Sequence, residues 1–161
     1  MPLRNLLLTL HIFGAIVAFG PTFAFPFIGA MGKKEGAPVP WLLKLTETIE
    51  RKLTLPVALT LQPATGAWLI VQSHNQWNPF VHRNRWLLAA LIIYVVAVSF
   101  AVFVQDRNAG KAIRMADAGQ YGPEFGGLMK KLERGGQFLT VLLVTIIILM
   151  VVKPGSGTIH F

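Results

Sequence analysis

The four histidines of this chain can take part in more kinds of chemistry than its other residues, because an imidazole can bind a metal ion or haem iron, or move a proton, near neutral pH. They are His11, His74, His82 and His160, and we expect all four toward the same side of the fold. No HxH or HxxxH spacing places two of them together on one helix. The histidines predict a transition-metal or haem site with His11, His74 and His82 as ligands, although solvated side chains are the simpler interpretation of the last three in the chain. For His11, a neutral imidazole hydrogen-bonded between helices is slightly favoured over a ligand.

Two further polar residues, Gln62 and Tyr94, fall inside apolar stretches at a depth that matches His11. At a rise of about 1.5 Å per residue, His11 and Tyr94 each lie about 12 Å from one end of their helices, and Gln62 lies about 15 Å from the same side. Each shares a helical face with small residues, which let neighbouring helices approach closely. We therefore expect the three side chains to meet, either as hydrogen-bonded packing or as a cofactor site in which Gln62 and Tyr94 support His11.

Four long apolar stretches position these residues. About 20 apolar residues cross the hydrocarbon core of a membrane. Stretches of about that length or longer cover residues 6–31, 53–72 and 86–105, and a shorter one covers 137–152. The sequence therefore predicts an all-α transmembrane four-helix bundle, with residues 1–161 forming a single integral membrane domain.

Prolines predict irregularities in two of the helices. Pro21 and Pro26 lie toward the far end of the first stretch, so we expect that helix to tilt or bend. Pro63 has no N–H for the carbonyl of Leu59, so a kink, a water or a neighbouring donor should be found there.

The two longest polar connections, residues 32–52 and 106–136, contain amphipathic pieces with the sequences WLLKLTETIERK, KAIRMADA and PEFGGLMKKLERGG. Because apolar and basic residues are segregated, we expect short amphipathic helices in these cytoplasmic connections, lying along the membrane surface. The remaining connection, 73–85, carries Trp77 and Phe80, which are typical of the membrane interface.

The net charge of +8 indicates orientation rather than a nucleic-acid partner. Most basic residues flank the apolar stretches, and no basic stripe alternates with exposed aromatic residues, so we expect no nucleic-acid binding. Of the 15 Lys and Arg residues, 11 fall in the connections 32–52 and 106–136. The positive-inside rule then predicts a bacterial cytoplasmic (inner) membrane protein with both termini on the non-cytoplasmic side.

The sequence lacks the residues or motifs that several kinds of chemistry require. The chain has no cysteine, so disulfides, thiolate metal sites and cysteine nucleophiles are excluded. No glycine-rich phosphate loop, GxSxG or HExxH motif occurs. All seven acidic residues lie in the polar connections, which argues against a proton relay through carboxylates in the membrane. We identify no catalytic residue and favour a protein that is not an enzyme.

The first-stretch histidine, the segment LTLPVALTLQPATG and the terminal ILMVVKPG resemble a family of small four-span bacterial membrane proteins known as domain of unknown function 2269. The first-stretch histidine is more distantly similar to that of four-span haem-binding protoporphyrinogen oxidases and of copper-resistance membrane domains. In those oxidases a tryptophan follows the histidine where this chain has Ala18, and a lysine lies in a later span where residues 86–105 have none. These departures argue against the oxidase activity.

Three functions are compatible with these features. The favoured one is a structural or accessory subunit of a larger membrane complex or homo-oligomer, docking through its small-residue faces and otherwise contacting the lipid bilayer. The alternative is a haem- or metal-binding redox protein that uses His11. Transport of a small solute ranks last, because no inverted repeat or charged midplane residue supports it.

Overall fold

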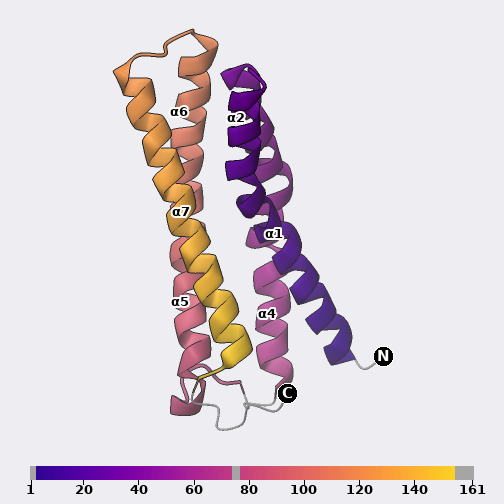
Figure 1. Cartoon of the computed structure of the whole chain (residues 1–161). Helices are drawn as coiled ribbons and strands as arrows, with labels where there is room; N and C mark the ends of the chain where they lie inside the picture. The colour runs from indigo at the N-terminus through magenta and orange to yellow at the C-terminus, as the bar shows by residue number, and fades with distance from the viewer. Residues whose placement is uncertain (1–2, 74–76, 155–161) are drawn as a thin grey trace.

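The computed structural model describes residues 3–73 and 77–154, in which helices joined by short turns form four antiparallel rods (Figure 1). The first rod is α1 (Leu3–Lys34), and the second runs through α2 (Val39–Ile49), η1 (Glu50–Thr54), α3 (Leu55–Leu59) and α4 (Leu61–Gln72). The third runs through η2 (His82–Asn84), α5 (Arg85–Phe100), η3 (Ala101–Gln105) and α6 (Asp106–Asp117), and the fourth is α7 (Pro123–Val152). The predicted all-α bundle is confirmed. We call the end where α1 begins and α7 ends the terminal end, and the opposite end the basic end.

All four rods are long and apolar enough to cross a membrane. They contain 32, 34, 36 and 30 residues, so at about 1.5 Å per residue each exceeds the roughly 30 Å of a hydrocarbon core. Large apolar side chains stand on the outside, among them Phe27, Val71 and Val151, which are 72%, 76% and 74% exposed. Such a surface suits lipid, and the excess length of the rods suits a part that extends beyond it.

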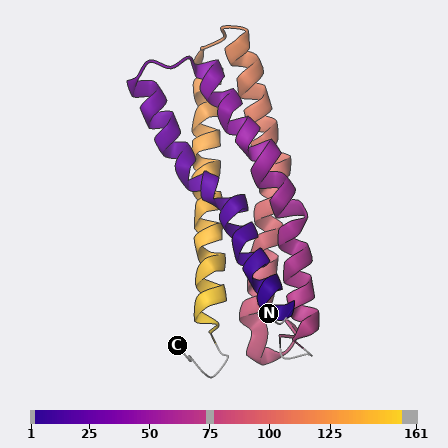
Figure 2. The ribbon, with the colours of Figure 1, turned by 90° about the vertical axis from the view of Figure 1, so that its right-hand side faces the viewer.

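Small residues fill the interior of the bundle. The helix α1 packs on α4 while α5 packs on α7, and the first rod crosses the others at an angle (Figure 2). The side chains of Ala18 on α1 and Ala90 on α5 are 0% and 1% exposed, and Gly14 is buried beside the second rod. The small-residue faces therefore turn inward, as close packing of helices requires.

One predicted proline effect is confirmed in the second rod. The helix breaks at Thr60, whose φ of −121° and ψ of −73° are not helical, three residues before Pro63. The amide of Thr60 and its hydroxyl both donate to the carbonyl of Pro56. In the first rod, α1 is tilted against the other rods, and it continues through Pro21 and Pro26 as one helix (Figure 2).

A π-helical turn interrupts each of the two middle rods, η1 in the second and η3 in the third. Each contains five residues and closes with a wide backbone hydrogen bond, from Leu55 to Glu50 in η1 and from Asp106 to Ala101 in η3. Arg51 in η1 donates from Nε and Nη2 to the two carboxylate oxygens of Asp106, at 2.8 and 3.1 Å. Single π turns are often found at functional sites.

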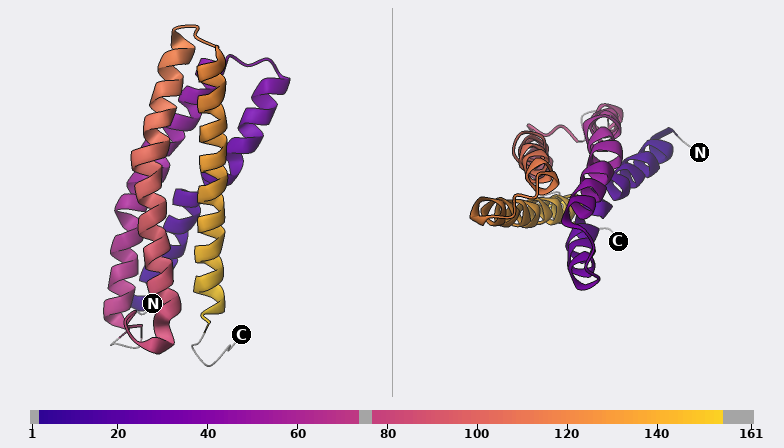
Figure 3. Two further views of the ribbon diagram at one scale, coloured as in Figure 1. Left: turned by 90° about the vertical axis from the view of Figure 1, so that its left-hand side faces the viewer. Right: turned by 90° about the horizontal axis from the view of Figure 1, so that it is seen from above.

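Beyond the π turns, α2, α6 and residues 123–134 of α7 form a packed unit at the basic end, which we call the head (Figures 1 and 3). Its core contains Ala112, Ala116, Phe125 and Leu128, surrounded by Leu43, Met115, Met129 and Leu132. Ion pairs of 2.7 Å link α2 to α6 (Lys44–Asp117) and α6 to α7 (Lys111–Glu124). The amphipathic helices that we expected along the membrane surface instead continue the rods. That expectation is wrong because α6 and α7 bury apolar residues against each other, with Leu43 of α2 packed against them.

Two adjacent glycines allow a test of this packing. A Cβ at Gly135 would overlap the amide of Gln105, which donates to the carbonyl of Leu132 at 3.0 Å, whereas a Cβ at Gly136 would meet nothing within 4 Å. We expect Gly135→Ala to lower the free energy of unfolding by about 1 kcal/mol, since the clash outweighs the better helix propensity of alanine. Gly136→Ala should leave it unchanged or raise it by up to about 1 kcal/mol. Unfolding in detergent, followed by circular dichroism, measures both, and equal shifts would contradict the contact.

Candidate functional site

His11 lies between α1 and α4, about two turns from the terminal end, and both of its ring nitrogens have partners. Its Nδ1 lies 2.9 Å from Oγ1 of Thr65, and its Nε2 lies 3.2 Å from Nε2 of Gln62. The ring also packs against Gly66, where a Cβ would come within 3.1 Å of Cε1. A glycine at that position lets the imidazole lie against the backbone of α4.

The neighbouring hydrogen bonds determine the tautomer of His11. The hydroxyl of Thr65 donates to the carbonyl of Leu61 at 2.7 Å, so its oxygen is left to accept from Nδ1–H of the histidine. The amide nitrogen of Gln62 can only donate, so Nε2 of His11 accepts. A neutral imidazole protonated on Nδ1 satisfies both contacts, which is the arrangement that we slightly favoured over a ligand.

This arrangement bears on the predicted metal site. A metal or haem iron at His11 would have to displace Gln62 from Nε2 or Thr65 from Nδ1. His82 lies on η2 with an exposed side chain, and His74 lies outside the described residues, as does His160. Within residues 3–73 and 77–154, no three His, Cys, Asp or Glu side chains are grouped so that they could hold a metal ion. Binding of a metal by His11, His74 and His82 stays a prediction.

Tyr94 has a different partner from the one expected. Its hydroxyl donates to the carbonyl of Ala58, just before the break at Thr60, and its ring packs edge to face on Phe19 with centroids 6.4 Å apart. The structure thus brings His11 and Gln62 together and places Tyr94 at the next turn of the second rod. Thr65, which completes the histidine contacts, lies on the same helical face as Gln62, so the sequence carried a signal for it. A cofactor role for His11, Gln62 and Tyr94 stays a prediction.

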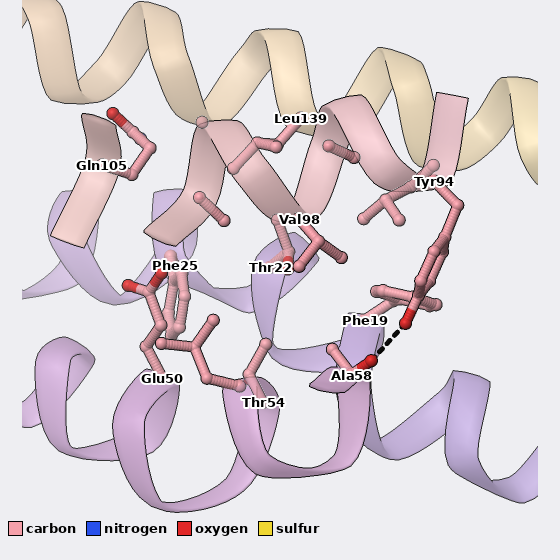
Figure 4. A pocket seen from close by; sticks show the side chains of 15 residues that line it. Phe19, Thr22, Phe25, Glu50, Thr54, Ala58, Tyr94, Val98, Gln105 and Leu139 are labelled. Carbon is pink, nitrogen blue, oxygen red and sulfur yellow. Dashed lines mark hydrogen bonds between the residues drawn. The ribbon is translucent and has the colours of Figure 1, made fainter. Parts of the chain in front are cut away.

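A cavity of about 90 Å³ lies farther along the bundle, between the Tyr94 contact and the head, and all four rods line it (Figure 4). Its walls are mostly apolar and include the aromatic rings of Phe19, Phe25 and Tyr94. Polar side chains enter from the two π turns: Glu50 and Thr54 from η1, and Gln105 from η3.

Several polar atoms of the residues that line this cavity lack a protein partner. Oε1 of Gln105 and Oγ1 of Thr54 are buried without a hydrogen bond, and the side chain of Glu50 has no hydrogen bond or ion pair within the described ranges.

We expected every carboxylate to lie in a polar connection, and this did not anticipate that the side chain of Glu50 lines the cavity. Glu50 precedes Thr54 by four residues and so extends the polar face of the second rod by one turn. Gln105 follows Ala101 by four residues and extends the small-residue face of Tyr94 in the same way. Gln105 is the last residue of the predicted stretch 86–105, so only the face of the second rod had to be followed one turn past its predicted end, to Glu50, to find the cavity.

Comparison with known proteins gives one match. The family model described as "Predicted integral membrane protein (DUF2269)" matches residues 5–154, which is nearly the whole chain. No curated protein and no solved structure matches.

The histidine contacts predict a structural effect on mutation. Hydrogen bonds between membrane helices average roughly 0.6 kcal/mol and seldom exceed about 2 kcal/mol. We expect His11→Leu to lower the free energy of unfolding by about 1 kcal/mol, because Gln62 and Thr65 lose their shared partner. Thr9→Val on the same helix is the control, since Thr9 bonds only within α1, to the carbonyl of Asn5, and should change stability by less than about 0.5 kcal/mol. A haem absorption band in the purified protein that His11→Leu abolishes would contradict a purely structural role.

Proposed function

Because the chain belongs to the DUF2269 family of predicted integral membrane proteins, we propose that it is a non-enzymatic accessory subunit of a membrane complex, located in a bacterial cytoplasmic membrane. The observation that carries this proposal is the head. Helices that only had to fill a bilayer would need about 20 residues each, whereas these rods continue into a unit with its own core and interhelical ion pairs. A folded unit held at the membrane surface is suited to contact another protein.

We propose that a partner docks on the head rather than on the small-residue faces that the sequence suggested. We expected the small-residue faces to bind a partner, but those faces are buried inside the bundle. On the head, Lys130, Lys131 and Arg134 are exposed along α7, and they have no ion-pair partner among the residues that the structure describes. A partner with an acidic surface would complement them.

Two other functions have weaker support. A redox role rests on His11, whose ring nitrogens already bond to Gln62 and Thr65. Transport of a small solute rests on the cavity, which has polar groups without partners. The accessory role is preferred because it accounts for the head as well.

The proposed orientation has both termini outside and the head in the cytoplasm, from the excess of basic residues at the head end. The chain contains no cysteine, so single cysteines can be placed freely. We expect Phe80→Cys, in the 84% exposed loop position at the terminal end, to react with an impermeant maleimide in intact cells. Gly127→Cys in the head should react only after lysis. The reverse pattern would invert the topology.

The docking surface predicts an effect of charge reversal. Native electrophoresis of solubilised membranes should show the protein in an assembly larger than one chain in its detergent micelle. Replacing Lys130, Lys131 and Arg134 by Glu should release it, because like charges would then face the acidic partner. Arg83→Glu at the terminal end is the control and should leave the assembly intact. Release by the control alone, or migration of the wild-type protein as a single chain, would contradict the proposal.

A further inference from the structure

We propose that the central cavity is a binding site for the protonated head of a small alkylamine, held by the carboxylate of Glu50 and the hydroxyl oxygen of Thr54. This site is separate from the histidine contacts and from the head surface. It is bounded by all four rods, so a ligand in it would contact each of them (Figure 4).

The polar groups of the cavity present acceptors. Oγ1 of Thr54 is buried and unbonded, and the Glu50 carboxylate can accept several hydrogen bonds. The amide of Gln105 is turned toward α7, where its nitrogen donates to the carbonyl of Leu132 and its oxygen lies against Gly135, so it closes the cavity on that side (Figure 4). An ammonium group, with its N–H donors and no acceptor, complements this set.

The charges around the cavity favour a cation. The guanidinium of Arg51 is engaged by Asp106 at 2.8 Å and by Glu47 at 3.4 Å, so it does not pair with Glu50. Of the three carboxylates around Arg51, Asp106 and Glu47 pair with it, and Glu50, which lines the cavity, does not. A bound cation would supply the missing charge.

The rest of the lining favours an organic cation over a hydrated metal ion. Phe19, Phe25 and Tyr94 contribute aromatic walls, and a cation near an aromatic face is attracted by the ring. Apolar side chains cover most of the remaining surface and would contact a short alkyl chain. A volume of about 90 Å³ exceeds the roughly 10–15 Å³ that one water needs and is below the roughly 150 Å³ of a cavity that binds benzene. The ligand is therefore small.

The test uses the purified full chain in detergent micelles and n-butylammonium as the probe, with calorimetric titration as the measurement. The titration is run at about pH 8, where an alkylamine, like a lysine side chain, is protonated. We expect saturable binding to the wild-type protein and a loss of affinity of about tenfold or more in Glu50→Gln, which removes a direct charge partner. Glu47→Gln is the matched control, because Glu47 is a neighbouring carboxylate that does not line the cavity. It should bind within about twofold of wild type.

Two further measurements keep the result decisive. The neutral probe 1-butanol should bind more weakly than n-butylammonium, and equally to the wild-type and Glu50→Gln proteins. Ala101→Leu, which fills the cavity and keeps the carboxylate, should abolish amine binding, and it replaces Glu50→Gln if that variant fails to fold. The proposal would be overturned by n-butylammonium binding no tighter than 1-butanol, which indicates a water-filled cavity, or by equal binding to wild type and both variants.

Discussion

Inside a bilayer no water competes for polar groups, so each backbone and side-chain donor or acceptor has to find its partner within the protein. Much of this bundle follows from that constraint. His11 is neutral and bonded on both sides because Gln62 and Thr65 sit on the facing helix. The Tyr94 hydroxyl bonds to a backbone carbonyl next to the helix break. Threonines farther along, such as Thr140 and Thr145, bond back to carbonyls of their own helix.

Four buried side-chain atoms among the described residues have no hydrogen-bond partner and so depart from this rule. Oγ1 of Thr54 and Oε1 of Gln105 belong to the two π turns, where the apolar part of the bundle meets the head. Oε1 of Gln62 and Nε1 of Trp86 lie nearer the terminal end. The head has its own small core and surface ion pairs, whereas the rest of the bundle depends on small residues and interhelical hydrogen bonds, so the π turns mark the junction of two kinds of packing.

The sequence was sufficient to predict those features of the structure that depend on its hydrophobic pattern and its prolines. Apolar stretch length predicted four spanning helices, and Pro63 predicted the break at Thr60. It was insufficient where tertiary partners decide. The amphipathic pieces look the same whether lipid or another helix covers them, and only the structure shows Phe125 and Leu128 covered by α6. Glu50 was missed because membrane spans were ended at the first charges, although the helix and its inward face continue.

The two π turns also bear on how this chain tolerates change in length. A π turn accommodates one residue more than an α-helix over the same axial distance, so it can be regarded as the trace of a single insertion. Removing one residue from Glu50–Thr54 would therefore turn η1 into α-helix and leave the helix before it nearly in place. Leu43 would stay at the head core and Lys44 beside Asp117, while the side chains of the turn itself would be redirected relative to the cavity. A deletion in the α-helical parts of the rods would instead rotate everything before it by about 100° about the helix axis, so the π turns are where these rods best tolerate the loss of a residue.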